Sequence, residues 1–197
     1  MKIAIIDYGA GNVFSVTSAL KRLGCEALLT ADADEIKKAD RVIFPGVGQA
    51  SAAMENLRKF NLDKLIPTLT QPVLGICLGM QLLCRFSEEE NTLGLGIIDN
   101  DVKAFVGDEK IPHMGWNNIT NLKTPLFDNI KEAERMYFVH SYYVPKGDYT
   151  IATCNYIHPF SAAVKQGNFF GCQFHPEKSS IEGSKILANF INNPDIL

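Results

Sequence analysis

The sequence contains no apolar run that approaches the roughly 20 residues a membrane-spanning helix requires. The apolar stretch after Met1 is interrupted at Asp7, too early for the core of a signal peptide. Basic residues show no excess, because 19 Lys and Arg stand against 22 Asp and Glu. These absences argue against a membrane protein, against secretion and against nucleic acid as the partner, so we expect a cytoplasmic location.

Cysteine is scarce, and its five copies lack the even number and regular spacing of a disulfide framework. Such usage fits a reducing compartment, in which a special thiol is catalytic or binds a metal. The hydrophobic share of 46% and the charged share of 21% are close to those of ordinary globular proteins. We therefore expect one globular domain over residues 1–197.

The first half of the sequence alternates short apolar segments with amphipathic ones. Such alternation is typical of a parallel sheet with helices on both faces. Asn12 is suited to cap the first helix, and Pro45-Gly46 is expected to end the third strand. The expected strands are 2–7, 27–30, 41–44 and 72–76, and the expected helices are 12–23, 50–60 and 78–84.

Beyond about Leu93, short β-like segments are separated by Gly, Pro, Asn and Asp. We expect these segments to add antiparallel strands to the sheet or beside it. A last helix, 179–191, is predicted to begin with a capping box formed by Ser179 and Glu182. The predicted fold is therefore α/β, with a mainly parallel sheet and added antiparallel strands.

One predicted turn combines a strand end, a helix start and a nucleophilic side chain. Cys77 lies between Gly75 and Gly79, in the G-x-nucleophile-x-G pattern of a nucleophile elbow. Backbone segments approach closely at such a turn, which leaves room only for glycine at the flanking positions. Amides at the helix start, including that of Leu78, favour a thiolate and can bind an oxyanion. We interpret Cys77 as a nucleophile, although a free cysteine is more commonly a small core residue.

A cysteine nucleophile needs an imidazole base and a group that orients it. Of four histidines, only His175 has a carboxylate two residues away, at Glu177, and extended backbone would place both on one side. A solvated surface pair is the ordinary alternative. Zinc is another, since Cys172 lies nearby, but the paired ligand spacings of zinc sites are missing and no metal is expected.

The elbow from Gly75 to Gln81, followed about a hundred residues later by Gln173 to Glu177, resembles the class I (triad) glutamine amidotransferases. The resemblance implies a flavodoxin-like α/β/α sandwich that needs no cofactor. It also implies that Cys77 attacks the side-chain amide of glutamine, while His175, oriented by Glu177, transfers protons. A glutamyl thioester would form, and ammonia would leave before water released glutamate.

Three further segments, 45–48, 111–117 and 137–142, are similar to one branch of that family, the glutaminase subunits of imidazole glycerol phosphate synthase in histidine biosynthesis. The strand-end loop Gly46-Val47-Gly48 is also a reasonable source of a second oxyanion amide on physical grounds. The resemblance implies a glutamine site lined by Gly48, Gln81, Ser141 and Tyr142. It places on the partner-facing surface Asn12, His113, Trp116, Tyr137 and Lys178. By their residue types alone, Trp116 is an ordinary core or interface residue, and His113 and His140 are ordinary structural histidines.

The same resemblance implies a heterodimer with a (β/α)8-barrel cyclase that uses the ammonia to make imidazole glycerol phosphate and an aminoimidazole carboxamide ribotide. Two alternatives stay open: the ammonia could serve a sugar amidotransferase in surface-polysaccharide synthesis, or the chain could be a regulatory relative without activity. A third interpretation is dinucleotide binding by Gly9-Ala10-Gly11-Asn12. Phe14 stands where that fingerprint requires its third glycine, which argues against it.

Overall fold

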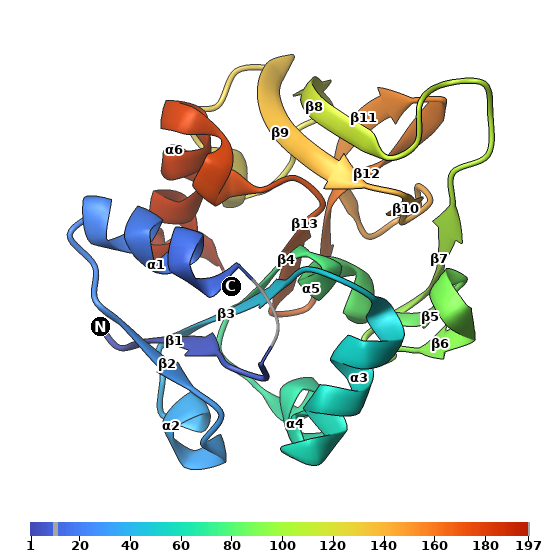
Figure 1. Ribbon diagram of the computed structural model, residues 1–197. Helices are drawn as coiled ribbons and strands as arrows, with labels where there is room; N and C mark the ends of the chain where they lie inside the picture. The colour runs from blue at the N-terminus through green and yellow to red at the C-terminus, as the bar shows by residue number, and fades with distance from the viewer. Residues whose placement is uncertain (10–11, 197) are drawn as a thin grey trace.

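The computed structural model describes residues 1–9 and 12–196, and a seven-stranded sheet runs through the middle of them (Figure 1). Five strands are parallel, in the order β13-β4-β3-β1-β2, and two antiparallel strands, β12 and β11, extend the edge beyond β13. The parallel order is that of flavodoxin-like folds. The bounds are β1 Ile3–Ile6, β2 Ala27–Thr30, β3 Arg41–Gly46, β4 Val73–Cys77, β11 Thr150–Tyr156, β12 His158–Gln166 and β13 Phe169–Cys172.

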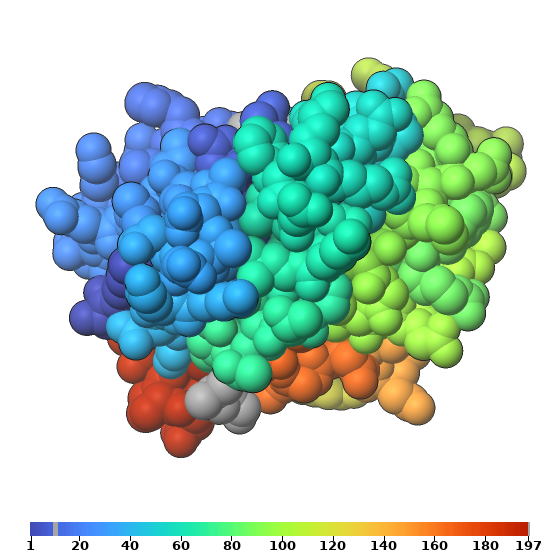
Figure 2. Space-filling view, turned by 90° about the horizontal axis from the view of Figure 1, so that it is seen from below, coloured from blue at the N-terminus to red at the C-terminus, as the bar shows by residue number. Residues whose placement is uncertain are grey.

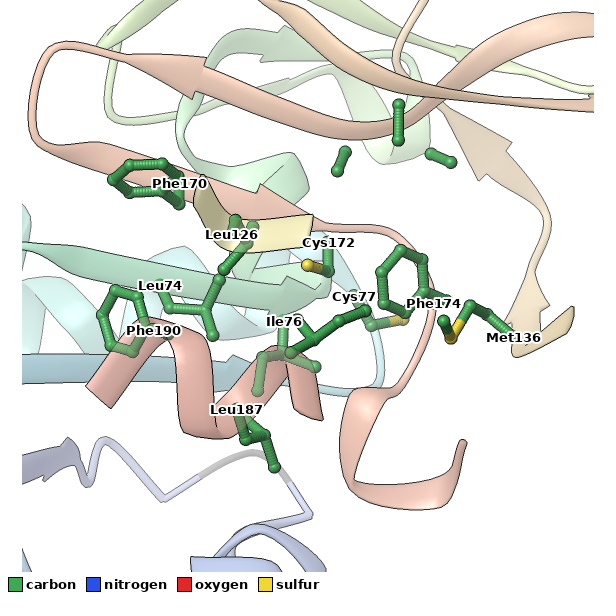
Figure 3. Close-up of a cluster of buried hydrophobic side chains, with 14 of the residues drawn as sticks. Leu74, Ile76, Cys77, Leu126, Met136, Phe170, Cys172, Phe174, Leu187 and Phe190 are labelled. Atoms are coloured by element: carbon green, nitrogen blue, oxygen red, sulfur yellow. The ribbon is translucent and has the colours of Figure 1, made fainter. Parts of the chain in front are cut away.

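Helices cover both faces of this sheet, as the sequence predicts. Side chains of β1 alternate, so that Ile3 and Ile5 join one buried cluster and Ala4 and Ile6 the other. Helices α1 (Val13–Arg22) and α6 (Ser180–Asn192) pack on the first face, and α2 (Ala33–Lys37), α3 (Ala50–Lys59) and α4 (Leu62–Leu65) on the second. Figure 3 shows the first cluster, where Phe190 and Leu187 of α6 approach Leu74 and Ile76 of β4. Figure 2 shows α2, α3 and α4 side by side on the second face.

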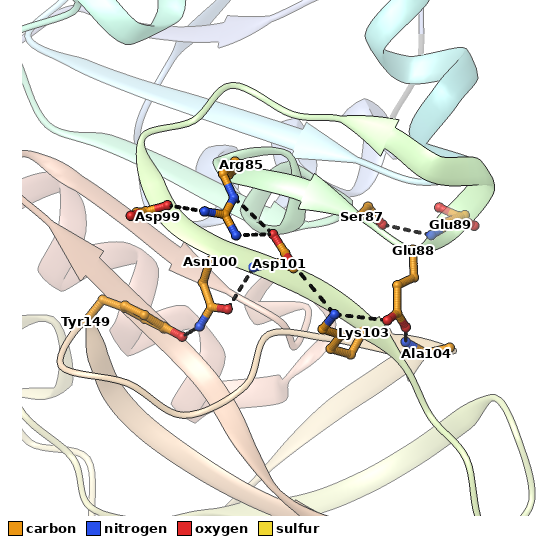
Figure 4. A network of polar contacts seen from close by, with 10 residues as sticks. All are labelled: Arg85, Ser87, Glu88, Glu89, Asp99, Asn100, Asp101, Lys103, Ala104 and Tyr149. Carbon is orange, nitrogen blue, oxygen red and sulfur yellow. Dashed lines mark hydrogen bonds and ion pairs between the residues drawn. The ribbon is translucent and has the colours of Figure 1, made fainter.

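Two smaller sheets flank the carboxyl end of the parallel strands. One is the antiparallel pair of β8 (His113–Ile119) and β9 (Glu134–His140). The other has the order β10-β7-β5-β6. Exposed ion pairs connect Arg85 of β5 with β7, and Lys103 of β7 with the turn that follows β5 (Figure 4). Such pairs contribute about 1 kcal/mol or less each. The bounds are β5 Cys84–Ser87, β6 Thr92–Leu93, β7 Ile98–Ala104 and β10 Tyr142–Tyr143, with short 3-10 turns η1 Ile66–Thr68, η2 Glu89–Asn91, η3 Pro125–Phe127, η4 Pro176–Lys178 and η5 Pro194–Ile196.

The prediction that one helix runs from Leu78 to Cys84 is wrong, because helix α5 (Leu78–Leu82) ends earlier and Cys84 begins β5. The carbonyl groups of Leu82 and Leu83 accept hydrogen bonds from the 95–98 segment, so they are not available to continue the helix. Local sequence shows no sign of this contact. Cys84 is nevertheless a core residue, as expected.

Two other boundaries also differ from the predictions. Strand β3 continues through Pro45. Proline has no backbone N–H to donate, but the pairing of β3 with β1 already ends at Ile43, so no hydrogen bond to β1 is lost at Pro45. The capping box of α6 does not form. Ser179 instead donates from its hydroxyl to the carbonyl of His175 and accepts from the N–H of Tyr137.

The junction of β3, β4 and α5 is packed so closely that a methyl group on Gly79 would lie 1.9 Å from the carbonyl oxygen of Phe44. We expect Gly79→Ala to lower the free energy of unfolding by about 3 kcal/mol, the upper part of the usual overpacking range. Gly24→Ala is the control, because that residue has φ +73 but open space around it and should cost about 1 kcal/mol of backbone strain. Denaturant titration compares them, and equal losses would contradict the packing interpretation.

Candidate active site

The pairing of β4 with β13 brings the two predicted motifs together. Cys172 lies opposite Ile76 in this parallel pair, so the residues that follow each strand emerge side by side at the same edge. Cys77 and His175 consequently line one cavity, although 98 positions separate them in the sequence. This juxtaposition is the arrangement that the sequence-based interpretation of Cys77 requires.

Cys77 occupies a strained elbow between β4 and α5. Its backbone has φ 54 and ψ −111, a conformation that residues other than glycine rarely adopt. Such strain is typical of functional sites. The sulfur is held from two sides, 3.8 Å from the carbonyl oxygen of Val139 and 3.8 Å from the Nε2 donor of Gln173. The thiol is therefore fixed in place while 7% of the residue remains exposed.

His175 and Glu177 form a buried pair behind the nucleophile. His175 Nδ1 lies 2.7 Å from Glu177 Oε1. The carboxylate can only accept, so Nδ1 carries a proton. Among the described residues, Nε2 is buried and has no hydrogen-bond partner. The backbone of His175 is also fixed, because its N–H donates to the carbonyl of Tyr137 and its carbonyl accepts from Ser179.

Electrostatics favour a charged imidazole at this position. Burial lowers the pKa of His175, but the interactions with Cys77 and Glu177 outweigh burial and raise the pKa to about 9. For the thiols of Cys84 and Cys154, burial is not outweighed by other interactions and raises the pKa of each to about 12. Those thiols remain protonated and unreactive near neutral pH.

The cavity beside Cys77 has a volume of about 310 Å³, within the range of small-molecule sites. Most of the predicted oxyanion and substrate residues lie on its wall. Gly46 lies just outside, paired with Cys77 in the sheet, and Glu177 lies behind His175. The lining residues are Val47, Gly48, Cys77, Leu78, Gln81, Glu89, Pro112, Val139, His140, Ser141, Tyr142 and His175.

Gln81 lines the cavity but is already engaged by the protein. Its Nε2 donates to the carbonyl of Tyr142 and to Oε1 of Gln173, both at 2.9 Å. Both amide hydrogens are thereby used, so a ligand can contact this side chain only through its oxygen. Gln81 thus supports the Tyr142 segment as well as the cavity wall.

Glu89 is a lining residue that the sequence analysis missed. It belongs to the acidic run Glu88–Glu90, which is typical of a solvated loop. The turn η2 places it on the cavity, and its Oε2 accepts the N–H of Ala50 at the start of α3 at 2.8 Å. Partial burial raises its pKa. No local pattern distinguishes it from its neighbours, so only the tertiary structure identifies it.

The predicted partner-facing residues do not all share one environment. Trp116 is 44% exposed and packs edge-on against the ring of Tyr137, its partner in the β8–β9 pair, at 6.1 Å. Lys178 is exposed and Asn12 half-buried, where it caps α1 through a bond from the N–H of Ser15. His113 differs, because it is only 3% exposed and lies beneath this surface.

Comparison with known proteins agrees with this geometry. The family model described as glutamine amidotransferase class-I matches residues 4–193. The chain belongs to the class I glutamine amidotransferases. Two similar members are named imidazole glycerol phosphate synthase subunit HisH: that of Bacteroides fragilis (strain YCH46) is 56% identical and that of Escherichia coli (strain K12) 49% identical, each over 97% of this chain and 99% of the relative.

Solved structures of other proteins share the fold. A crystal structure of a glutamine amidotransferase aligns with a TM-score of 0.76 at 16% identity, covering 97% of both chains. The structure of PurLQS from Thermotoga maritima aligns with a TM-score of 0.70 at 20% identity, again covering 97% of both chains. At these identities the likeness supports the flavodoxin-like architecture alone.

Within residues 1–9 and 12–196, no group of three or more His, Cys, Asp or Glu side chains is placed to hold a metal ion. The dinucleotide interpretation of the first loop involves Ala10 and Gly11, which lie outside the described residues. No helix of the part that is described has the length and apolar character needed to cross a membrane.

Replacement of Glu177 by Gln should lower the pKa of His175 from about 9, since the carboxylate favours the imidazolium. The raised pKa means that the pair stabilises the fold fully below about pH 6.5, the ordinary value, and that this contribution is lost as the pH rises through about 9. The variant should therefore lose more stability at pH 6 than at pH 9. NMR titration of the ring and denaturant titration at both pH values measure these effects.

Glu182→Gln serves as the control, because Glu182 forms an ion pair with Lys185 on α6, outside the active site. It should leave the His175 titration unchanged. An unaltered pKa in the Glu177 variant would show that the pair does not set the charge of the imidazole.

Proposed function

We propose that this chain is the glutaminase subunit of imidazole glycerol phosphate synthase, hydrolysing L-glutamine and passing ammonia to a barrel-shaped cyclase. The observation that carries the proposal is the buried His175–Glu177 pair beside Cys77 at a strained elbow, opening on a cavity of amino-acid size. The printed names of the full-length relatives support the choice of synthase. The arrangement of Cys77, His175 and Glu177 is suited to glutaminase chemistry.

Catalysis begins from the ion pair in which the Cys77 proton has passed to Nε2 of His175, which has no other partner among the described residues and whose raised pKa favours the imidazolium. The thiolate attacks the amide carbon of glutamine, and the carbonyl oxygen becomes an oxyanion. The imidazolium then gives its proton to the amide nitrogen and the C–N bond breaks. Ammonia departs, and a glutamyl thioester remains on Cys77. A water molecule, deprotonated by the neutral imidazole, attacks that thioester. Glutamate is released, and the proton returns from the imidazole to regenerate the thiol.

Two backbone amides are suited to the oxyanion. One belongs to Leu78, the first residue of α5, and the other to the Val47–Gly48 loop that follows β3 across the cavity. Gly48 has φ +93 with open space around it, and Val47 is 39% exposed. This loop can therefore rotate its amide toward or away from the substrate without disturbing the core.

We expect glutaminase turnover to rise about 10²-fold to 10³-fold when the cyclase and its substrate bind, because one missing oxyanion donor costs that much. Cys77→Ala should abolish turnover in either state. Cys25→Ala is the matched control, a half-buried free cysteine outside the cavity. Ammonia production with and without a purified barrel cyclase provides the measurement. Full activity of the isolated chain would contradict the loop hypothesis, and ammonia transfer only to a sugar amidotransferase would assign a different partner.

Glu89 is the one carboxylate among the described residues that line the cavity, and we propose that it binds the α-ammonium group of glutamine. Glu89→Gln should raise the KM for glutamine about tenfold to a hundredfold, the usual effect of losing a charged hydrogen bond. The control is Glu90→Gln, because its carboxylate pairs with the Ser51 hydroxyl away from the cavity. Steady-state kinetics compare them, and equal KM values would refute this assignment.

A further inference from the structure

Two buried histidines outside the triad form a hydrogen-bonded pair that the catalytic cycle does not use. His113 on β8 and His140 on β9 are directly opposite in the antiparallel pair, and His113 Nδ1 lies 2.9 Å from His140 Nε2. Both are nearly inaccessible, at 3% and 6% exposure. The His113 ring is stacked on Tyr156 and on Phe138, with centroids 4.0 and 4.9 Å apart. Such packing prevents either ring from turning freely.

Hydrogen bonding determines which nitrogen carries the proton in each ring. His140 Nδ1 lies 2.7 Å from the carbonyl oxygen of Tyr142, which can only accept, so Nδ1 is the N–H. His140 Nε2 must then accept, and the proton between the rings belongs to His113 Nδ1. His113 Nε2 in turn accepts from the side-chain amide of Asn117 at 3.2 Å. Every ring nitrogen is satisfied when both histidines are neutral Nδ1–H tautomers.

The neutral state also fits the surroundings of the pair. Burial lowers the pKa of His113 to about 4. Burial, assisted by the nearby His113 and His175, outweighs the hydrogen bond to Tyr142 and lowers the pKa of His140 to about 3. A proton on His140 would place a second cation beside the imidazolium of the triad. Neutral histidines therefore provide donors next to the active site without competing for its charge.

The pair ends on the wall of the glutamine cavity. The carbonyl of Tyr142 accepts from His140 Nδ1 and from Gln81 Nε2, so both of its lone pairs are used. Gln81 also donates to Gln173, whose own amide donates to the sulfur of Cys77. One continuous series of hydrogen bonds thus connects β8 with the nucleophile.

We infer that His140 is a positioning residue for glutamine: in the Nδ1–H form that His113 maintains, it fixes the Tyr142 carbonyl, and with it the Ser141–Tyr142 wall and the Gln81 amide. This inference rests on the proposed glutaminase function. His140 itself transfers no proton in the reaction, because its donor and its acceptor nitrogen are both engaged by the protein. Its loss should therefore impair binding more than chemistry.

Steady-state kinetics with L-glutamine test this inference in the chain together with its cyclase. His140→Leu should raise KM at least about tenfold with kcat within about threefold, since a buried carbonyl loses one of two donors. His140→Asn keeps a donor near the Nδ1 position and should return KM to within about threefold of the wild type. His158→Leu is the control, because His158 packs on Phe105, as His140 does, without joining the series.

The inference is overturned if His140→Leu leaves KM unchanged, if kcat falls more than KM rises, or if Asn fails to rescue. A ¹⁵N NMR measurement of the imidazole nitrogens in the wild-type chain decides the tautomers independently of activity. Two Nδ1–H rings support the inference, and an Nε2–H form of His140 overturns it. Wild-type protein that does not hydrolyse glutamine, with or without the cyclase, would count against the proposed function instead.

Discussion

The parallel pairing of β4 with β13 is the constraint on which the active site depends. Residues 73–77 and 169–172 are nearly a hundred positions apart, yet their register sets Ile76 opposite Cys172 and directs both following segments to one edge. A shift of one residue would turn every side chain of β13 to the opposite face of the sheet. Burial of Phe170 against α6 and of Phe169 in the opposite cluster prevents such a shift. The hydrophobic core therefore sets the position of the base relative to the nucleophile.

Within that frame, the charged groups beside the nucleophile form one pair, and the polar groups around that pair are neutral. A buried carboxylate and imidazole are costly unless each is compensated, and His175 and Glu177 compensate each other at 2.7 Å. One oxygen of Glu177 and Nε2 of His175 lack partners in the described part of the chain, so the pair is not fully satisfied. An unsatisfied nitrogen next to a thiol is useful, because it can hold the proton that the thiol gives up. Around it, Gln81, Gln173 and His140 are neutral and hydrogen-bonded within the protein, which holds the wall without adding charge.

Much of the fold could be predicted from local pattern, because the strands and helices of the first half carry their own periodicity and turn residues. The contacts of Cys77, His175 and Glu177 were partly predictable, since glycines flank Cys77 for steric reasons and the other two residues are close in sequence. The pair nevertheless forms differently from the prediction, because Glu177 lies in the 3-10 turn η4 and not on extended backbone. Glu89, the end of α5 at Leu82 and the bonds of Ser179 were not predictable, because each depends on a segment distant in the sequence. The family resemblance placed His113 on the partner-facing surface, and the structure shows instead that it is buried and paired with His140.

Some elements around the cavity are held more firmly than others, and this difference indicates which of them a partner can move to regulate activity. The triad is held by the sheet register, by the backbone bonds of His175 and by the contacts of the Cys77 sulfur, so small displacements there would be costly. The Val47–Gly48 loop is different, because Gly48 has open space around it and Val47 is partly exposed. Binding energy from a partner changes an equilibrium only through an element with two accessible arrangements. A loop at the rim meets that requirement, whereas the buried triad does not, so we expect regulation to act on the oxyanion amide and to leave the nucleophile and base already assembled.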